Sequence, residues 1–382
     1  QAMSSRLIVN SIRHTGASGD AVTLANDGTC TANITNNLSN RNLIINGAMQ
    51  VAQRGTSSTS EGYQTVDRFY CGSGGTDEAP TFSQVDVASG TTPYTLGFRK
   101  ALKFTNGNQT SGAGAGDFMY LKYCFEAQDM ANSGWNYLSS SSYVTLSFWV
   151  KSSVAQSFKA YFQTRDSTHY QYPFETGSLS ADTWTKVTKT ISGNSNLTFN
   201  SDNGLGLELY IWSFLGTDYT ASSVTEDAWS TYADAARTKD VTSTWYTTND
   251  ATLEFTGFQL EVSDHATDFE HLSYGDTLAK CQRYCCVISG SSGLVMYNDI
   301  YSTDTISTWA SLPVTMRTTP SITQTGSGGT SSSGFSYTNL AATPTLAATH
   351  PSGIIVYRGV ATSARTYIYL ATSGELTMEA EL

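Results

Sequence analysis

Strict alternation of apolar and polar residues is the feature that most constrains what this chain can fold into. Residues 143–151 read YVTLSFWVK, and the side chains that share one face of an extended strand there are Val144, Leu146, Phe148 and Val150. The same spacing recurs at residues 158–162 and 205–211. Because an α-helix repeats every 3.6 residues and a strand every two, these segments predict half-buried β-strands.

A change of register inside one segment predicts a β-bulge. Leu253 and Phe255 are out of step with Phe258 and Leu260, and Gly257 stands between the two registers. One extra residue in a strand of an antiparallel pair produces such a shift. Strands of this kind, joined by loops rich in Gly, Ser and Asn, predict an antiparallel two-sheet jelly roll over residues 41–275.

The flanking segments predict an all-β chain with three further parts. Residues 1–40 hold short apolar pieces between turn signals, which predicts a stalk or collar segment that needs other copies of the chain for stability. Asp276 and the residues after it predict a capped short helix, so residues 276–286 are expected to form a helical connector. Residues 287–382 are again β-branched and aromatic and predict a small C-terminal β-sandwich.

Charge excludes some partners. Charged residues make up 14% of the chain, against roughly 25% in an ordinary soluble domain. The net charge of -11 would repel nucleic acid, so no nucleic-acid binding is expected. No apolar run is long enough to cross a bilayer, and the first residues lack the apolar core of a signal peptide, so no membrane insertion is expected.

The cysteines predict free thiols rather than a disulfide framework. The six positions are Cys30, Cys71, Cys124, Cys281, Cys285 and Cys286. They are too far apart in the sequence to indicate a small fold held together by disulfides in a chain of this length. The last three form a CxxxCC cluster, but no matching His or Cys pair at zinc spacing accompanies it, so buried thiols on a short helix are the preferred interpretation.

No common catalytic motif is present. The sequence contains no GxSxG elbow, HExxH pair or phosphate-binding glycine loop. Glycoside hydrolysis stays open because its two carboxylates need only be close in space. A catalytic pair also needs mutual tuning of pKa values, for which the sequence gives no sign, so we expect no enzymatic activity and no catalytic residue.

A structural calcium ion is the one cofactor considered. Acidic and imidazole side chains gather between Glu261 and Asp276, and oxygen ligands would suit calcium. Asp67, Glu261 and Asp264 are the candidate ligands. The alternative, that these residues are the exposed side chains of a strand and its turn, is preferred.

The order of several motifs resembles a known family. NLIINGAMQVAQRGTS, VDRF and LSFWVKS are followed by a strand opening at Trp184 and by GFQLEVSDHATDFEHLSYGDTLAKCQRY. Further on come LPVTMRTTPSIT and the closing MEAEL. Together these motifs resemble the tail fibres of tailed bacteriophages, and the β-rich part is similar to carbohydrate-binding-module jelly rolls.

The resemblance implies a receptor-binding role in the virion tail fibre. It implies a homotrimer, joined through its N-terminus to other phage tail proteins, that attaches to a bacterial surface glycan. Two other functions remain open: a purely structural fibre component without a ligand, and a polysaccharide depolymerase. Because the chain and many bacterial glycans are both acidic, bridging by divalent cations is a further hypothesis.

Aromatic side chains are the candidate glycan contacts, because sugars present flat C–H faces to them. Strand registers place Trp149, Tyr161, Tyr210 and Trp212 on faces opposite the aliphatic core, where something must cover them. Neighbouring copies or a packed domain are the preferred cover, and a glycan is the alternative. Expected loop and tip candidates are Trp135, Tyr137, Tyr170, Trp229, Trp245 and Trp309.

Overall fold

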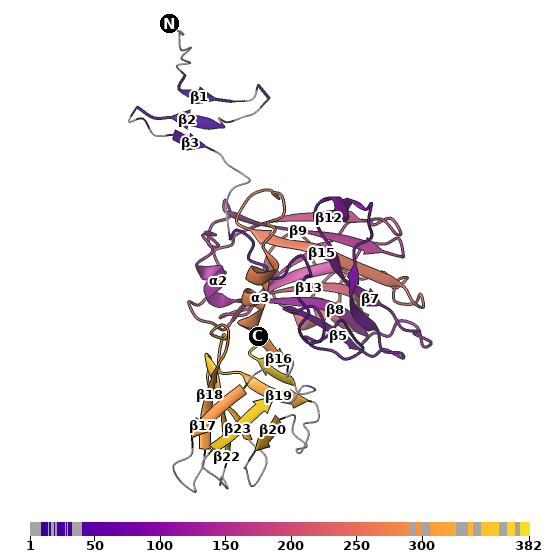
Figure 1. The fold of residues 1–382 in the computed structure, drawn as a ribbon. Coiled ribbons are helices and arrows are strands. Elements are labelled where there is room, and N and C mark those ends of the chain that lie inside the picture. The colour runs from indigo at the N-terminus through magenta and orange to yellow at the C-terminus, as the bar shows by residue number, and fades with distance from the viewer. Residues whose placement is uncertain are drawn as a thin grey trace.

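A computed structural model describes residues 40–289 without a break. It also describes residues 9–13, 15–16, 19, 21–26, 28, 30–32, 295–299, 306–325, 335–338, 345–358, 365–370 and 375–382. The described part is almost entirely β, with a large central sandwich followed by smaller C-terminal sheets (Figure 1). The all-β class expected from the alternation is confirmed.

Two six-stranded antiparallel sheets form the sandwich. The first sheet, in the order β14-β11-β10-β13-β8-β5, contains β5 (Phe69–Gly74), β8 (Phe118–Glu126), β10 (Lys159–Thr164), β11 (Tyr170–Glu175), β13 (Leu205–Leu215) and β14 (Ser230–Thr231). The second, in the order β12-β9-β15-β7-β6-β4, contains β4 (Ser57–Ser58), β6 (Thr81–Asp86), β7 (Lys100–Thr105), β9 (Tyr143–Ser152), β12 (Thr185–Ser192) and β15 (Thr252–Glu261).

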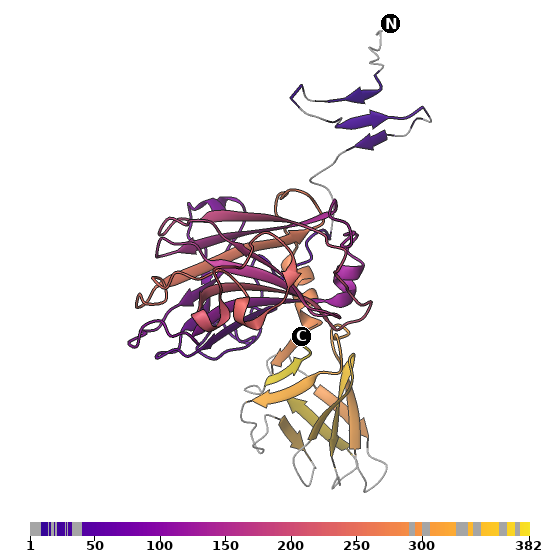
Figure 2. The same cartoon turned by 180° about the vertical axis from the view of Figure 1, so that it is seen from behind.

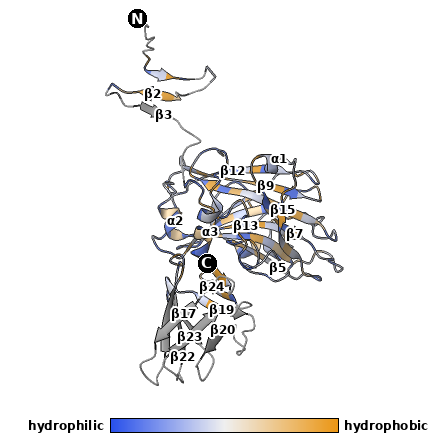
Figure 3. Ribbon diagram, viewed as in Figure 1, coloured by the Kyte–Doolittle hydropathy of each residue, from blue (hydrophilic) through white to orange (hydrophobic). Residues whose placement is uncertain are grey.

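Apolar side chains from both sheets meet in one core. On β9, Val144, Leu146, Phe148 and Val150 are at most 2% exposed, as the alternation predicts. Phe162 of β10 and Leu209 of β13 lie in the same cluster. Figure 3 shows apolar residues distributed along the strands of this sandwich.

The bulge predicted in the last strand of the sandwich is confirmed. The pairing of β15 with β9 shifts register between Thr256 and Gln259. Gly257 has a φ of +69°, and a Cβ placed on it would lie 2.7 Å from the Phe98 ring. Only glycine avoids both the left-handed strain and this contact.

Four short helices connect the strands of the sandwich. They are α1 (Thr92–Thr95), α2 (Ala127–Ala131), η1 (Thr217–Tyr219) and η2 (Asp234–Ala236). The longer α3 (Tyr274–Gln282) begins two residues before the helix expected from Asp276. The reason is that Ser273 is the N-cap: its hydroxyl accepts from the Asp276 amide and donates to the Asp276 carboxylate.

Smaller sheets flank the sandwich. The N-terminal one contains β1 (Ser11–Ile12), β2 (Val22–Leu24) and β3 (Cys30–Ala32). The C-terminal strands form three sheets, β16-β24-β19, β17-β23-β20 and β18-β22-β21. Figure 2 shows these C-terminal strands in orange to yellow. Their bounds are β16 (Cys285–Ser289), β17 (Val295–Asp299), β18 (Ile306–Ser311), β19 (Ser321–Thr325), β20 (Phe335–Thr338), β21 (Thr345–His350), β22 (Gly353–Arg358), β23 (Arg365–Leu370) and β24 (Glu375–Glu379).

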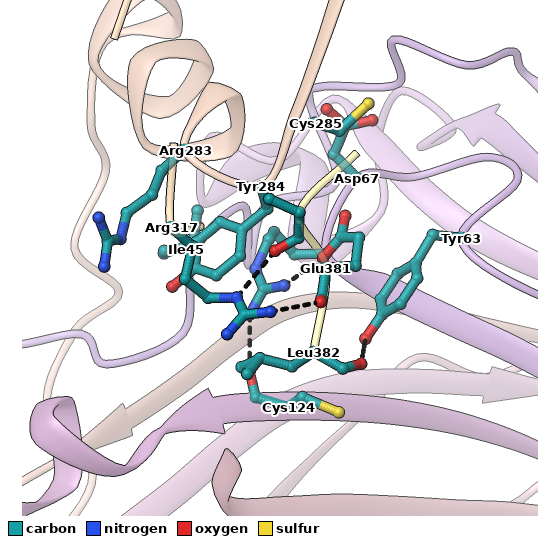
Figure 4. A network of polar contacts seen from close by, with 12 residues as sticks. Ile45, Tyr63, Asp67, Cys124, Arg283, Tyr284, Cys285, Arg317, Glu381 and Leu382 are labelled. Atoms are coloured by element: carbon teal, nitrogen blue, oxygen red, sulfur yellow. Dashed lines mark hydrogen bonds and ion pairs between the residues drawn. The ribbon is translucent and has the colours of Figure 1, made fainter. Parts of the chain in front are cut away.

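A buried polar network joins the last residues to the sandwich. Figure 4 shows Glu381 and Leu382 among Tyr63, Tyr284 and Arg317. The Tyr63 hydroxyl donates to the Leu382 carbonyl over 3.2 Å, and Arg317 Nη2 donates to the Glu381 carbonyl over 2.8 Å. These contacts fix the position of β24 against the sandwich.

The described cysteines are buried thiols, as the sequence predicts, but Cys285 and Cys286 lie at the start of β16 rather than on the helix. Among the described side chains, Cys71, Cys124, Cys281, Cys285 and Cys286 are buried and free. Burial raises the pKa of the Cys124 thiol to about 11, so it stays protonated at neutral pH. None of the helices in the described ranges has both the length and the apolar character needed to span a bilayer.

Candidate functional site

One face of the first sheet carries a continuous group of aromatic rings, here called the outer aromatic face. Its members are Tyr70, Phe118, Tyr120, Tyr161, Tyr210 and Trp212. Cross-strand pairing brings them together, because Tyr210 lies opposite Tyr161 and Trp212 lies opposite Tyr120. These rings alternate with core residues such as Leu209 and Ile211, so they lie on the side of the sheet away from the core.

The rings lie in stacked and tilted pairs. The Tyr210 and Trp212 rings are 5.5 Å apart with an interplanar angle of 7°, and the Tyr161 and Tyr210 rings are 5.0 Å apart at 26°. The Tyr120 and Trp212 rings are 5.0 Å apart. Such contacts hold each ring in one orientation, which makes the group a rigid platform.

Two glycines of β5 let this platform extend over the edge strand. A Cβ on Gly72 would lie 2.5 Å from the Tyr120 ring, and a Cβ on Gly74 would lie 2.5 Å from the Phe118 ring. Both rings therefore lie directly over the glycine backbone. A side chain at either position would displace the ring above it.

A loop of the same chain, residues 216–241, covers part of this face. Tyr219 and Tyr232 pack against the cluster, and the Arg237 guanidinium lies 4.5 Å from the centre of the Tyr219 ring. Tyr161 and Trp212 are consequently only 1% exposed, whereas Tyr120 and Tyr210 stay half-buried. The cover for these aromatic residues thus comes in part from their own chain.

A cavity of about 210 Å³ remains between the platform and the loop. Its lining residues are Phe118, Tyr120, Tyr161, Gln163, Arg165, Tyr210, Trp212, Tyr219, Tyr232 and Arg237. Within the described part of the chain, that lining holds two arginines and no carboxylate. The cavity is smaller than the roughly 300–1,000 Å³ of pockets for drug-sized ligands, so it suits a single small unit of a larger ligand.

Three residues that line the cavity each carry a buried hydrogen-bond donor without an acceptor in the described part of the chain. Gln163 Nε2, Trp212 Nε1 and Arg237 Nε are buried, and none has a hydrogen-bond partner within the residues that the structure describes. Buried donors are normally paired, because leaving one unpaired costs about 1–3 kcal/mol. Three such donors from three segments of the chain are the strongest sign of a ligand site in this structure.

A buried carboxylate lies beside the cavity. Glu208 is 2% exposed, and its Oε1 is 3.6 Å from Lys122 Nζ while its Oε2 is 3.5 Å from Arg165 Nη1. Its charge is therefore balanced by two cations of the neighbouring strands. The Lys122 ammonium also lies 4.6 Å from the centre of the Tyr70 ring.

Tyr161, Tyr210 and Tyr232 remain neutral at physiological pH. Burial, followed by the Glu208 carboxylate, raises the pKa of Tyr210, and burial likewise raises that of Tyr161. Burial and the hydrogen bond to Asp234 raise the pKa of Tyr232 to about 12. Hydrogen bonds from Arg237 and then Tyr232 lower the pKa of Asp234, which stays ionised and holds Arg237 in place.

Three of the expected glycan candidates meet at this site: Tyr161, Tyr210 and Trp212. Trp149 lies on the outer face of the other sheet, in a separate cavity of about 220 Å³ that Phe98, Lys186 and His271 also line. For Trp309 only the backbone, in β18, belongs to the described part.

Two other aromatic candidates, Trp245 and Trp135, lie in the core. Trp245 is 0% exposed and donates through Nε1 to the Thr252 carbonyl, and Trp135 is 3% exposed and donates to the Ser142 carbonyl. The expectation for these two residues is wrong, because core packing covers their rings. Trp229, Tyr137 and Tyr170 are half-buried and pack against the core cluster.

The candidate calcium ligands do not gather. Asp67 accepts from the Gln53 amide and side chain, and Glu261 accepts from Thr267. Asp264 is exposed and lies 2.6 Å from His265 Nδ1. Across the described ranges, no three His, Cys, Asp or Glu side chains lie in a group that could hold a metal ion. Protein donors already satisfy the two buried carboxylates.

A larger cavity beside α3 lacks a platform of aromatic rings. Its volume is about 520 Å³, and Tyr284 is the one aromatic residue among the described side chains that line it. Amides and charges dominate the rest of its wall, including Gln128, Lys280 and Arg283. The outer aromatic face is therefore the better candidate for ligand binding.

Several residues of the site escaped the sequence analysis. Phe118 and Tyr120 alternate with the core residues Met119 and Leu121, so the period-two rule applied to residues 118–126 could have found them. Tyr219 and Arg237 come from a loop without periodicity. Their approach to the sheet is a tertiary contact that no local pattern encodes.

No protein-family model matches the chain, and no curated sequence matches it. Similar solved structures include the enzymatically active domain of tailspike protein 4 of bacteriophage CBA120, at 9% identity and a TM-score of 0.33, over 58% of this chain and 22% of that chain.

Two further similar structures are binding modules. One is the family 11 carbohydrate-binding module of Clostridium thermocellum, at 10% identity and a TM-score of 0.25, over 56% of this chain and 98% of that one. The other is the N-terminal cellulose-binding domain of Cellulomonas fimi β-1,4-glucanase C, at 12% identity and a TM-score of 0.28, over 56% and 98%.

Proposed function

We propose that this chain is a bacteriophage tail-fibre protein that attaches the virion to a glycan of the bacterial surface. The observation that carries the glycan part is the outer aromatic face, where Tyr120 and Tyr210 border a cavity with unpaired donors. Aromatic rings next to hydrogen-bond donors suit a sugar, which has an apolar C–H face and polar edges. The order of sequence motifs supports the tail-fibre part.

Binding rather than cleavage is part of this proposal. Hydrolysis of a glycosidic bond normally needs two carboxylates on either side of it. In support, the described lining of the cavity contains none, and the nearby Glu208 is ion-paired and buried. The test is incubation with host polysaccharide followed by a reducing-sugar assay, in which we expect no new reducing ends.

A trimer and virion attachment through the N-terminal segment complete the proposal. Residues 22–24 and 30–32 form short strands, and the side chains of residues 22–24 are half-buried or exposed, which supports winding with other copies. Multi-angle light scattering of the intact chain should give three times the mass of one chain. A monomer would contradict the trimer while leaving the glycan site untouched.

The experiment that tests glycan binding compares matched tyrosine variants on susceptible cells. We expect Tyr120→Ala combined with Tyr210→Ala to lower retention at least tenfold. Tyr274→Ala removes an exposed tyrosine from α3 and should retain binding. Thermal unfolding of each variant separates loss of the platform from loss of the fold. If the folded double variant and the control were retained equally on the cells, the alternative of a purely structural fibre component would be favoured.

A further inference from the structure

From the polarity of the cavity we infer its ligand class: the site takes an acidic sugar, one that carries a carboxylate or a comparable anionic group. This inference rests on the proposed glycan binding and adds to it the chemistry of the sugar. Its basis is the mismatch between donors and acceptors in the cavity described above.

The first step concerns hydrogen bonding. The unpaired groups Gln163 Nε2, Trp212 Nε1 and Arg237 Nε are all donors, so the missing partner must be rich in acceptors. Tyrosine hydroxyls in the wall can act either way. The unpaired acceptor nearby, Glu208 Oε2, lies within 3.5 Å of Arg165 and is compensated by that charge. A neutral sugar hydroxyl could pair with one of these donors, but a carboxylate, with two oxygens and no proton, fits several at once.

The second step concerns charge. A net charge of -11 makes the chain as a whole repel anions. Around this cavity the balance is reversed, because Glu208 is paired with Lys122 and Arg165 while Asp234 is paired with Arg237, so that three cations face two carboxylates. Guanidinium groups recognise carboxylates in a planar, two-point geometry that lysine does not offer. Local positive charge inside an acidic protein is what selective binding of an anion requires.

The third step concerns the fixed position of Arg237. Its Nη2 donates to Asp234 over 2.6 Å, and its guanidinium lies 4.5 Å from the Tyr219 ring centre and 5.8 Å from the Trp212 ring centre. Asp234 holds one end of the group while Nε stays unpaired. Arg237 is therefore held in place before any ligand arrives, which lowers the entropic cost of binding.

The test is an array of bacterial surface polysaccharides that includes neutral members, uronic-acid members and carboxyl-reduced copies of the latter. The intact chain should bind uronic-acid members, lose at least tenfold in affinity for their carboxyl-reduced copies, and bind less tightly as salt rises. Binding that persists with a chelator would support direct recognition by arginine, and binding abolished by chelator would overturn it in favour of a bridging metal ion.

Arginine variants assign the effect to this cavity. Arg237→Gln should lose at least tenfold in affinity for the acidic polysaccharide, and Arg237→Lys should be intermediate. The matched control is Arg99→Gln, because Arg99 is an exposed arginine whose guanidinium lies 4.0 Å from the Tyr94 ring centre. Equal or tighter binding of neutral polysaccharides would overturn the acidic-sugar inference and leave glycan binding intact. If the chain bound no polysaccharide of the array, the proposed function itself would be contradicted.

Discussion

Arg68 and Glu381 form an ion pair between residues 313 positions apart in the chain. The Arg68 guanidinium is buried, lies 3.4 Å from the centre of the Tyr284 ring and donates to the Cys124 carbonyl. Burial alone would lower the pKa of Arg68, but the nearby Glu381 carboxylate helps to raise it well above its ordinary value. This pair ties the partly buried C-terminal residues to the sandwich.

Removal of the Glu381 charge should therefore destabilise the sandwich. Glu381→Gln leaves the buried Arg68 cation without its carboxylate, and loss of one partner from a buried pair costs roughly 3–5 kcal/mol. Chemical denaturation measures the effect. The double variant Arg68→Met with Glu381→Leu removes both charges of this pair, and Arg54, which also contacts Glu381, keeps its pair with Glu379. The double variant should therefore lose less stability than Glu381→Gln alone. A double variant less stable than the single variant would contradict this account.

The contacts of Glu126 with Arg283 and Tyr284 predict that the stability of the fold falls in acid. Burial favours the protonated form, but hydrogen bonds from Arg283 and Tyr284 outweigh it, so the pKa of Glu126 lies below its ordinary value of 4.5. A carboxyl with a lowered folded-state pKa contributes stability above the ordinary value, and that contribution is lost as pH falls through the folded-state pKa. We expect the free energy of unfolding to fall as pH drops below about 4.5.

Glu126→Gln tests this pH dependence. Because Arg283 is 34% exposed, the loss of these contacts at neutral pH should be about 2 kcal/mol, in the range for hydrogen bonds to charged groups. The variant should also show a flatter decline in stability between pH 5 and pH 3 than the wild type. Asp86→Asn removes the exposed pair with Lys100 and should change stability by less than about 0.5 kcal/mol.

Alanine at Gly257 should destabilise the sandwich. The φ of +69° strains any L-residue, and the added methyl group would lie 2.7 Å from Phe98 and 3.1 Å from Trp149. Left-handed strain and overpacking together predict a loss of about 3 kcal/mol in the free energy of unfolding. Gly116→Ala is the control, since its Cβ would meet only Asp218 Oδ2 at 3.5 Å. Similar unfolding curves for the two variants would refute the bulge argument.

The alternation along the strands made much of the fold predictable. It placed Val144 and Phe148 in the core and Tyr210 and Trp212 on the opposite face, because every second side chain of a strand must share its environment. Loops give no such signal, so Trp245 was predicted as a ligand contact although its ring is buried. The loop from 216 to 241 and the pair of Arg68 with Glu381 arise from contacts between distant segments, which local sequence patterns do not encode.

A methyl group on Gly72 should impair the site without unfolding the chain. Its Cβ would lie 2.5 Å from the Tyr120 ring, at the half-exposed edge of the platform, so the ring must move. We expect Gly72→Ala to weaken glycan binding about tenfold, which corresponds to roughly 1.4 kcal/mol, at nearly unchanged thermal stability. Binding equal to that of wild type would show that Tyr120 is no part of the platform.

Two glutamines on adjacent strands allow the sharpest test of the site. Gln163 of β10 and Gln171 of β11 are paired across the sheet, and each is 2% exposed. The Gln171 side chain is satisfied: its Nε2 donates to the Ala236 carbonyl over 2.8 Å and its Oε1 accepts from the Ala233 amide. Gln163 Nε2, in contrast, has no partner within the described residues.

Leucine should therefore have opposite effects at these two positions. Gln163→Leu removes an unsatisfied donor and should leave the free energy of unfolding unchanged or raise it by about 1 kcal/mol, while glycan affinity falls about tenfold. Gln171→Leu leaves the Ala236 carbonyl without its donor and should lower the free energy of unfolding by about 1–3 kcal/mol. Denaturation and binding measured on both variants check this. If Gln163→Leu destabilised the chain as much as Gln171→Leu, Gln163 would be a structural residue rather than a group reserved for a ligand.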